Sequence, residues 1–308
     1  MITIFLITII SIAILLVLGG LANFYIQKRR SEKVCLPWFD PADMVDIAGI
    51  PTHVVTRGSG EPLIFVHGSQ MNIYDWRFNI DFFAKHFKVY AMDMPGCGFT
   101  GKPDADYSPA FFAQFIFSLM EHYHLEKASF VASSWGGGHV FYFALQRPEK
   151  VTGLAMSSPC GLPHRLALLD RVLALPVLGT LAALYGNRDL IEGELKAAFA
   201  DKSFVTELLI DSAFKPLFMP GGLRATVRSY QKADFTFVQD NLEKISAPVL
   251  LVWGTRDAAH PPWMLDEMKR RLPHCESCLI DNVGHLPHEE ASAQFNQVAL
   301  EFLKRAVR

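Results

Sequence analysis

This sequence has few charged residues and few cysteines. Asp, Glu, Lys and Arg together make up 19% of its 308 residues, and the formal net charge is −2. It lacks the basic stripe with interleaved aromatic residues that is typical of nucleic-acid-binding proteins, so nucleic acid is not expected as a partner. Internal repeats and low-complexity tracts are also missing outside the N-terminal segment. The length suits one large domain or two modest ones.

The cysteines do not form a pattern typical of disulfide-stabilised proteins. They are odd in number and scattered over the chain, at Cys35, Cys97, Cys160, Cys275 and Cys278. Cys275 and Cys278 have the CxxC spacing of metal and redox sites. Both fall in a predicted strand, however, where residues three apart point to opposite faces of the sheet. We therefore interpret them as two packed thiols and expect no metal site.

Charge is absent altogether from residues 1–27, which are mostly Ile, Leu, Phe and Val. A helix needs about 20 apolar residues to cross a bilayer, so this segment is long enough to be a transmembrane anchor. A cleaved signal peptide usually starts with basic residues and has a shorter apolar region. Here the cations follow the apolar run, at Lys28, Arg29 and Arg30, which favours an uncleaved anchor.

The alternative of a signal peptide stays open, because the stretch Gly19-Gly20-Leu21-Ala22 is suitable for cleavage. For an anchor, the basic residues after the span place the body of the protein on the cytoplasmic side of the membrane. Residues 28–43, with Pro37 and Pro41, are predicted to be a linker.

After the linker, short apolar runs alternate with helical patterns, which is typical of a mostly parallel sheet covered by helices on both faces. The predicted strands are 44–48, 52–56, 63–66, 88–92, 128–131, 151–156, 248–253 and 275–280. The predicted helices are 74–86, 109–124, 140–145, 263–272 and 292–308. The first two strands, joined by a tight turn, are expected to form an antiparallel edge.

Residues 161–241 interrupt this alternation. They are rich in Leu, Ala and Phe, contain several Pro and Gly, and show no strand pattern. We interpret them as a helical cap over the carboxyl edge of the sheet, where α/β proteins bind ligands. The α/β core then comprises residues 44–160 and 242–308. The apolar residues of the cap suggest an apolar substrate; they are Leu173, Leu175, Leu178, Leu181, Leu184, Phe214, Leu217, Phe218 and Met219.

The stretch Ala132-Ser133-Ser134-Trp135-Gly136 lies between a predicted strand and a predicted helix. A serine at such a tight turn, with small residues two positions before and after it, is typical of a nucleophile elbow. Ser134 meets this requirement, because Ala132 and Gly136 flank it. Ser133 does not, because its flanking residues are Val131 and Trp135. Ser134 is therefore the predicted nucleophile.

A serine nucleophile needs a base beside it and a carboxylate that orients the base. Asp257 follows the predicted strand 248–253, and His285 follows the strand 275–280, in the chain order serine, acid, histidine. His288 is a second candidate, but it falls in the approach to the last helix, so His285 is preferred. The alternative role for Asp257 is that of a turn or helix-capping residue.

An oxyanion hole requires two backbone N–H donors aimed at the developing negative charge. The amide of Trp135 follows the nucleophile and lies at the positive end of a helix. The second donor is expected from the loop after the strand 63–66, where Ser69 is the predicted residue. His67 is expected to brace this loop rather than to take part in chemistry.

Five motifs in this order resemble those of the α/β-hydrolase family over residues 44–308: Phe65-Val66-His67-Gly68-Ser69, Asp93-Met94-Pro95-Gly96-Cys97-Gly98, the elbow at Ser134, Gly254-Thr255-Arg256-Asp257 and Val283-Gly284-His285. The resemblance implies a serine hydrolase that forms an acyl-enzyme and needs no cofactor. It disfavours the family members with an aspartate nucleophile, epoxide hydrolases and haloalkane dehalogenases.

The leading hypothesis is a membrane-anchored esterase or lipase that acts on a small apolar ester. The same triad also serves carbon–carbon bond hydrolases, thioesterases, perhydrolases and hydroxynitrile lyases, because fold does not decide the reaction. A third possibility is a ligand-binding protein that has kept the fold without turnover. The complete set of Ser134, Asp257 and His285 argues against that last reading.

Overall fold

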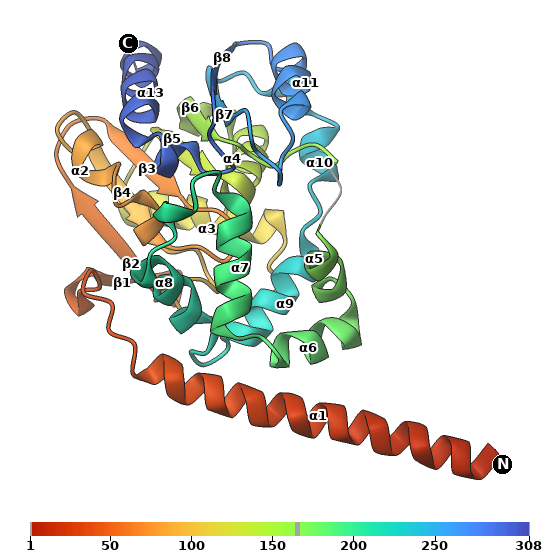
Figure 1. Cartoon of the computed structure of the whole chain (residues 1–308). Coiled ribbons are helices and arrows are strands. Elements are labelled where there is room, and N and C mark those ends of the chain that lie inside the picture. The colour runs from red at the N-terminus through yellow and green to blue at the C-terminus, as the bar shows by residue number, and fades with distance from the viewer. Residues whose placement is uncertain (1, 164–166, 308) are drawn as a thin grey trace.

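An eight-stranded sheet forms the centre of the molecule (Figure 1). The computed structural model describes residues 2–163 and 167–307, so a few positions of the predicted anchor, cap and core (1, 164–166 and 308) lie outside it. The strand order is β1-β2-β4-β3-β5-β6-β7-β8, with β2 antiparallel to β1 and β4 and the other neighbours parallel. The predicted α/β fold and its antiparallel edge are confirmed.

The strand bounds follow the predicted apolar runs closely. They are β1 (Met44–Ile47), β2 (Ile50–Arg57), β3 (Pro62–Val66), β4 (Lys88–Met92), β5 (Ala128–Ser133), β6 (Val151–Ser157), β7 (Val249–Gly254) and β8 (Cys275–Ile280). The central strands β3, β5 and β7 are buried almost throughout, because helices cover both of their faces.

Two apolar clusters lie on opposite faces of the sheet. One contains side chains of α3 (Pro109–His122), α4 (Ser134–Gln146) and α11 (Trp263–Arg271). The other contains side chains of α2 (Ile80–Phe83) and α13 (Ser292–Ala306). Cys275 packs against the first cluster and Cys278 against the second, as expected for strand residues three apart, and both are free thiols.

The predicted helix over residues 74–86 is wrong. The segment forms a short 3-10 turn, Ile73–Trp76, and then the single turn of α2. Asn72 caps the first turn by accepting from the amide of Tyr74. The side chain of Asn79 donates to the carbonyl of His288 and to the side chain of Asn296. Such polar side chains compete with a continuous helix by making local and tertiary hydrogen bonds.

Among the described residues of 161–241 there are helices and turns but no strand, in agreement with the predicted helical insertion. The helices are α5 (Leu168–Leu173), α6 (Pro176–Leu184), α7 (Arg188–Ala198), α8 (Glu207–Leu217), α9 (Gly222–Lys232) and α10 (Thr236–Gln239). The remaining short elements are 3-10 turns at Pro41–Asp43, Pro148–Lys150, Lys202–Phe204 and Leu242–Lys244, and α12 (Pro287–Glu290).

The N-terminal helix α1 (Ile2–Glu32) extends away from the body and lies beside α6 and α8 (Figure 1). It continues through the basic residues Lys28, Arg29 and Arg30, so part of the predicted linker is helical. Lys and Arg are good helix formers, and their charge is favourable at a helix C-terminus. Residues 7–32 are the one segment in the described chain that is long and apolar enough to cross a membrane.

Asp93, which follows β4, connects three loops at the carboxyl edge of the sheet. Its fully buried carboxylate accepts hydrogen bonds from the amides of Ile73 and Phe99 at 2.7 and 2.8 Å. His53 Nδ1 lies 2.8 Å from the same group. Burial alone would raise the pKa of Asp93, but the hydrogen bond and charge of His53 outweigh it and lower this pKa.

We expect Asp93→Ala to destabilise the fold by about 3 kcal/mol or more, because two buried amides and an imidazole lose their acceptor. The measurement is the free energy of unfolding by urea. Asp46→Ala is the matched control, because Asp46 accepts from the amide of Gly49 at an exposed turn. Equal losses in the two variants would contradict the role assigned to Asp93.

Candidate active site

The turn from β5 to α4 holds Ser134 in a constrained backbone conformation. Its φ is +49°, in the left-handed region that non-glycine residues rarely adopt. Two positions later, a Cβ on Gly136 would come within 2.3 Å of the carbonyl oxygen of His67 and 2.6 Å of that of Val66. Only glycine permits this approach. The local geometry is therefore that of the predicted nucleophile elbow.

Three predicted residues from distant loops meet at this turn. His285 Nε2 lies 3.0 Å from Ser134 Oγ, and His285 Nδ1 lies 2.9 Å from Asp257 Oδ2. An ionised carboxylate only accepts hydrogen bonds, so Nδ1 carries the proton and Nε2 is left to accept from the serine hydroxyl. His288, the alternative base, does not contact Ser134; it bonds Ser157 instead.

Asp257 is held in its ionised form. Burial would raise its pKa, but the charge of His285 and the hydrogen bond to it outweigh burial, and the pKa of Asp257 is lowered. The amide of His260 donates to Asp257 Oδ1 at 2.8 Å, and the His260 ring packs edge-on against that of His285 at 4.7 Å. His260 is not among the predicted site residues; its sequence signal is the spacing of an aspartate-capped turn, three residues after Asp257.

The loop that carries His285 is fastened to the cap. The amide of His285 donates to the carbonyl of Ala198, the last residue of α7, at 2.7 Å. The carboxylate of Glu290 accepts from the amide of Gly284 at 2.7 Å and from those of Ala200 and Asp201 at 3.1 and 2.6 Å. Glu290 is not among the predicted site residues, since two of its three partners, Ala200 and Asp201, lie about 90 residues away in the sequence.

The two residues predicted to form the oxyanion hole, Ser69 and Trp135, line one small cavity together with Gly68 and Gly136. Its volume is about 20 Å³, enough for a single water molecule. His67 braces the loop: its Nε2 accepts from the amide of Met94 at 2.9 Å, so Nδ1 carries the proton and donates to the carbonyl of Gly68 at 2.8 Å.

The cap is closed over these groups. Ser134, Asp257 and His285 are only 8%, 4% and 7% exposed. The apolar cap residues listed from the sequence do not line the small cavity at the elbow. Leu173 is buried in an apolar cluster of the cap, and the ring of Phe214 packs against that of Phe218. Phe218 also packs against Phe24 of α1, whereas Leu178 is exposed. Apolar character near the elbow comes instead from Met94, Phe112 and Trp135.

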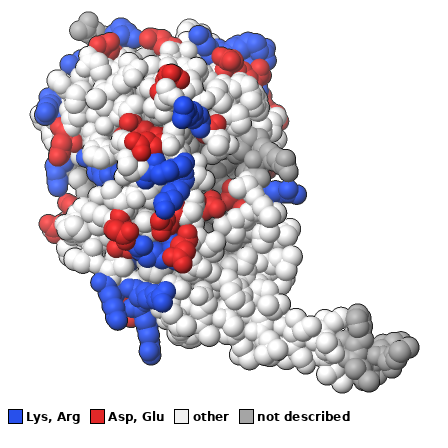
Figure 2. Space-filling model, viewed as in Figure 1, with Lys and Arg blue, Asp and Glu red and all other residues white. Residues whose placement is uncertain are grey.

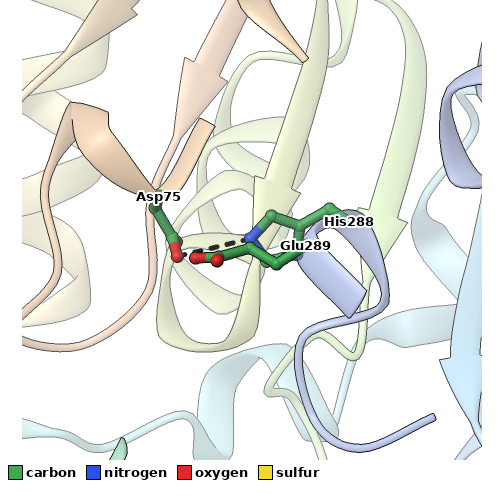
Figure 3. Close-up of side chains that lie close together, drawn as sticks. All are labelled: Asp75, His288 and Glu289. Atoms are coloured by element: carbon green, nitrogen blue, oxygen red, sulfur yellow. Dashed lines mark ion pairs between the residues drawn. The ribbon is translucent and has the colours of Figure 1, made fainter. Parts of the chain in front are cut away.

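Behind the site lies a buried cluster of Asp75, His288 and Glu289 (Figure 3), the one group of described carboxylate and imidazole side chains close enough together to hold a metal ion. The cluster has partners of its own, however. The Arg77 guanidinium contacts the Glu289 carboxyl group, Ser157 Oγ lies 2.8 Å from His288 Nδ1, and His288 Nε2 lies 3.4 Å from Asp75 Oδ1. These contacts link the cluster to Arg77 and Ser157.

The two carboxyl groups of this cluster carry one negative charge in total, because one is ionised and the other is protonated. Burial alone would raise the pKa of Asp75, but the charge and the hydrogen bond of His288 lower this pKa to about 2. For Glu289, burial and the negative charge of Asp75 raise the pKa well above its usual value. Glu289 is thus neutral where Asp75 is ionised, as expected of two buried carboxyls in contact.

The sequence of this chain matches a known family. The model of the α/β hydrolase fold matches residues 61–292, more than half of the chain. This chain belongs to the α/β hydrolase fold family. A soluble epoxide hydrolase from Corynebacterium sp. is 35% identical over 281 residues, which are 83% of this hydrolase and 94% of the relative.

Two further comparisons show how widely the fold is used. A dihydrolipoyllysine-residue acetyltransferase component of the acetoin cleaving system from Pseudomonas putida is 28% identical over 80% of this hydrolase, which spans only 64% of that relative's length. The structure of a meta-cleavage product hydrolase from Pseudomonas fluorescens superposes with a TM-score of 0.75 at 22% identity, over 85% of this chain and 97% of that one. The last likeness shows the shared fold.

The raised pKa of Glu289 gives a pH-dependent prediction. The folded state holds this proton more tightly than the unfolded state, whose pKa is near 4.5, so stability falls as pH rises from 4.5 toward the folded pKa. Glu289→Gln removes this titration. We expect its free energy of unfolding relative to wild type to improve over that interval, by about 1.4 kcal/mol per pH unit.

The measurement is urea unfolding of both proteins from pH 4.5 upward. Glu301→Gln, at an exposed position of α13, is the matched control and should follow the wild-type curve. Parallel curves for Glu289→Gln and wild type would show that Glu289 does not hold the proton.

Proposed function

We propose that this hydrolase cleaves carboxylic esters of apolar acyl or aromatic groups, with Ser134 as nucleophile. The observation that carries the proposal is the continuous chain of contacts from Asp257 through His285 to Ser134 Oγ, at 2.9 and 3.0 Å. These distances are those at which a histidine takes a proton from a serine hydroxyl.

In the first half-reaction, Ser134 Oγ attacks the ester carbonyl carbon, and its proton moves to His285 Nε2. The carbonyl oxygen becomes an oxyanion, which the backbone amides of Ser69 and Trp135 are proposed to bind. Asp257 stabilises the imidazolium that forms. When the carbon–oxygen bond to the leaving group breaks, His285 returns the proton to the departing alcohol, and the acyl group remains on Ser134.

In the second half-reaction, water replaces the alcohol. His285 Nε2 takes a proton from water as the water oxygen attacks the acyl carbon. The tetrahedral species collapses, the proton passes to Ser134 Oγ, and the carboxylic acid leaves. In sum, one ester and one water are converted to an acid and an alcohol.

A serine at position 134 favours acyl transfer over epoxide hydrolysis, the reaction in the name of the Corynebacterium relative. A serine ester is opened by water at its carbonyl carbon, and the geometry around Ser134 offers His285 to activate that water. The carbon–carbon bond hydrolysis named for the meta-cleavage product hydrolase uses the same fold, and a substrate panel separates it from ester cleavage.

We further propose that α1 anchors the hydrolase in a membrane, with the body on the side of the basic residues Lys28, Arg29 and Arg30, the cytoplasmic side. The support is the length and apolar composition of the helix, which contains an 18-residue stretch with a mean hydropathy of 2.4. A cleaved signal peptide is the alternative, and the size of the mature chain in membranes distinguishes the two.

We expect Ser134→Ala to lower kcat for short and medium acyl esters by at least about 10⁴-fold, because it removes the attacking oxygen. It should also abolish labelling by a fluorophosphonate probe. Ser133→Ala is the matched control: Ser133 is buried beside the nucleophile but makes no hydrogen bond to His285, and the variant should keep both properties.

Three outcomes would overturn the ester proposal. Ester hydrolysis that persists in Ser134→Ala would exclude Ser134 as the nucleophile. Folded wild-type protein that neither reacts with the probe nor turns over any ester would favour a ligand-binding role. An epoxide or a vinylogous carbon–carbon substrate hydrolysed in preference to all esters would identify the alternative reactions.

A further inference from the structure

The outer surface of α5 and α6 is strongly apolar although it is open to solvent. Its large exposed side chains, here called the α5–α6 face, are Leu168, Leu175, Val177, Leu178 and Tyr185. Leu168 and Val177 are 74% and 78% exposed. Residues 172–186 contain no charged side chain, so α6 is apolar on its outer as well as its inner side. Helices apolar on all sides are normally buried in protein or in lipid.

Helix α1 is docked directly beside this face (Figures 1 and 2). The hydroxyl of Tyr185 donates to the carbonyl of Leu16 at 2.7 Å. The side chain of Asn23 donates to the carbonyls of Leu184 and Gly186 at 2.9 and 3.0 Å. In Figure 2 the surface beneath the cap continues as a white area into α1 without a charged side chain between them.

The backbones approach closely at this contact. A Cβ on Gly20 would lie 2.9 Å from Leu184 Cβ, so α6 packs where glycine leaves room. Glycine inside a helix costs about 1 kcal/mol relative to alanine, and here the cost is offset by the packing it allows. The contact is thus a fitted helix–helix interface, and α1 and α6 move together as long as it holds.

The length of α1 determines where α6 lies in a bilayer. The contacts with the cap begin at Leu16, so the helix from Ile2 to residue 15 is clear of the body. Fourteen residues span about 21 Å, whereas the hydrocarbon core of a bilayer is about 30 Å thick. While α1 stays docked, it can fill the core only if the adjoining part of the cap enters the leaflet by about 9 Å.

We infer that the α5–α6 face is immersed in the leaflet through which α1 leaves the membrane, so that the hydrolase has a second membrane contact besides its anchor. The inference rests on the proposed function in taking α1 as a membrane anchor. The occupant of the face is the acyl-chain region of the phospholipid bilayer. Its chemistry matches a face whose exposed side chains are mostly aliphatic and which has no charge over residues 172–186; the exposed Arg171 of α5 lies just before them.

This placement defines the route and the class of the substrate. The inner sides of α5 and α6 pack through Leu173 and Ala183 against Val227 of α9. The same helix carries Tyr230, whose ring lies 5.0 Å from that of Trp135 at the elbow. Two layers of helices, α5 with α6 and then α9, therefore separate the lipid from the candidate oxyanion site. A lipid ester reaches Ser134 when both layers move aside, without crossing bulk water.

The test is photocrosslinking in the full chain. The photoreactive residue p-benzoylphenylalanine replaces Leu178, 55% exposed on α6, or in the matched control Leu279, 49% exposed on β8 at the far end of the molecule. Each protein is reconstituted into phosphatidylcholine vesicles that contain a trace of alkyne-tagged phosphatidylcholine. After irradiation and flotation, we expect several-fold more lipid adduct at position 178 than at position 279.

Failure of the membrane anchor and failure of the immersed face give different results in this experiment. If the chain fails to float with the vesicles, α1 is no anchor, and the proposed membrane attachment fails. If the chain floats but position 178 gives no more lipid adduct than position 279, the anchor stands and the immersed face is refuted. A covalent dimer of the chain from position 178 would refute it as well, by assigning the α5–α6 face to a second copy.

Discussion

The close contact between the start of α4 and the loop after β3 sets the geometry of the whole site. Because Gly136 has no Cβ, the carbonyls of Val66 and His67 approach the elbow within van der Waals distance. That approach places the loop of Ser69 beside Ser134 and keeps Ser134 in its left-handed conformation. Packing, and not the catalytic groups themselves, thus holds the nucleophile where the base can reach it.

The base is held from the opposite side, by the cap. His285 bonds the carbonyl at the end of α7, and Glu290 gathers three amides from the cap and from the loop that carries His285. The site is nearly closed, so the cap has to move before a substrate can enter. Because Glu290 bonds both the cap and the loop of His285, a movement of the cap also shifts His285. Entry of the substrate and the position of the base are therefore coupled.

Patterns in the sequence predicted most of the sheet and the three residues that meet at the elbow. Strand runs, the flanking residues of Ser134 and the chain order of Asp257 and His285 are local signals, and the structure brings these residues together. The predicted helix at 74–86 failed because Asn79 and its neighbours bond residues more than 200 positions away. The apolar cap residues suggest an apolar substrate, but they can equally pack on one another. Periodicity shows only that a helix is apolar; the partner of each face depends on helix packing, which sequence spacing does not contain.

The docking of α1 also determines which changes of length this chain tolerates. Tyr185 donates to the main-chain carbonyl of Leu16, an atom that every residue has, so this hydrogen bond does not depend on which apolar side chain stands at position 16. Gly20 and Asn23, in contrast, are fixed by their contacts with α6 and with the residues that follow it. The spacing from Leu16 to Asn23 is not free, because one inserted residue rotates Asn23 by about 100° away from α6. Residues before Leu16 carry no such restriction. A change of length before Leu16 is therefore expected to leave the docking of α1 against α6 intact, whereas one between Leu16 and Asn23 is expected to break it.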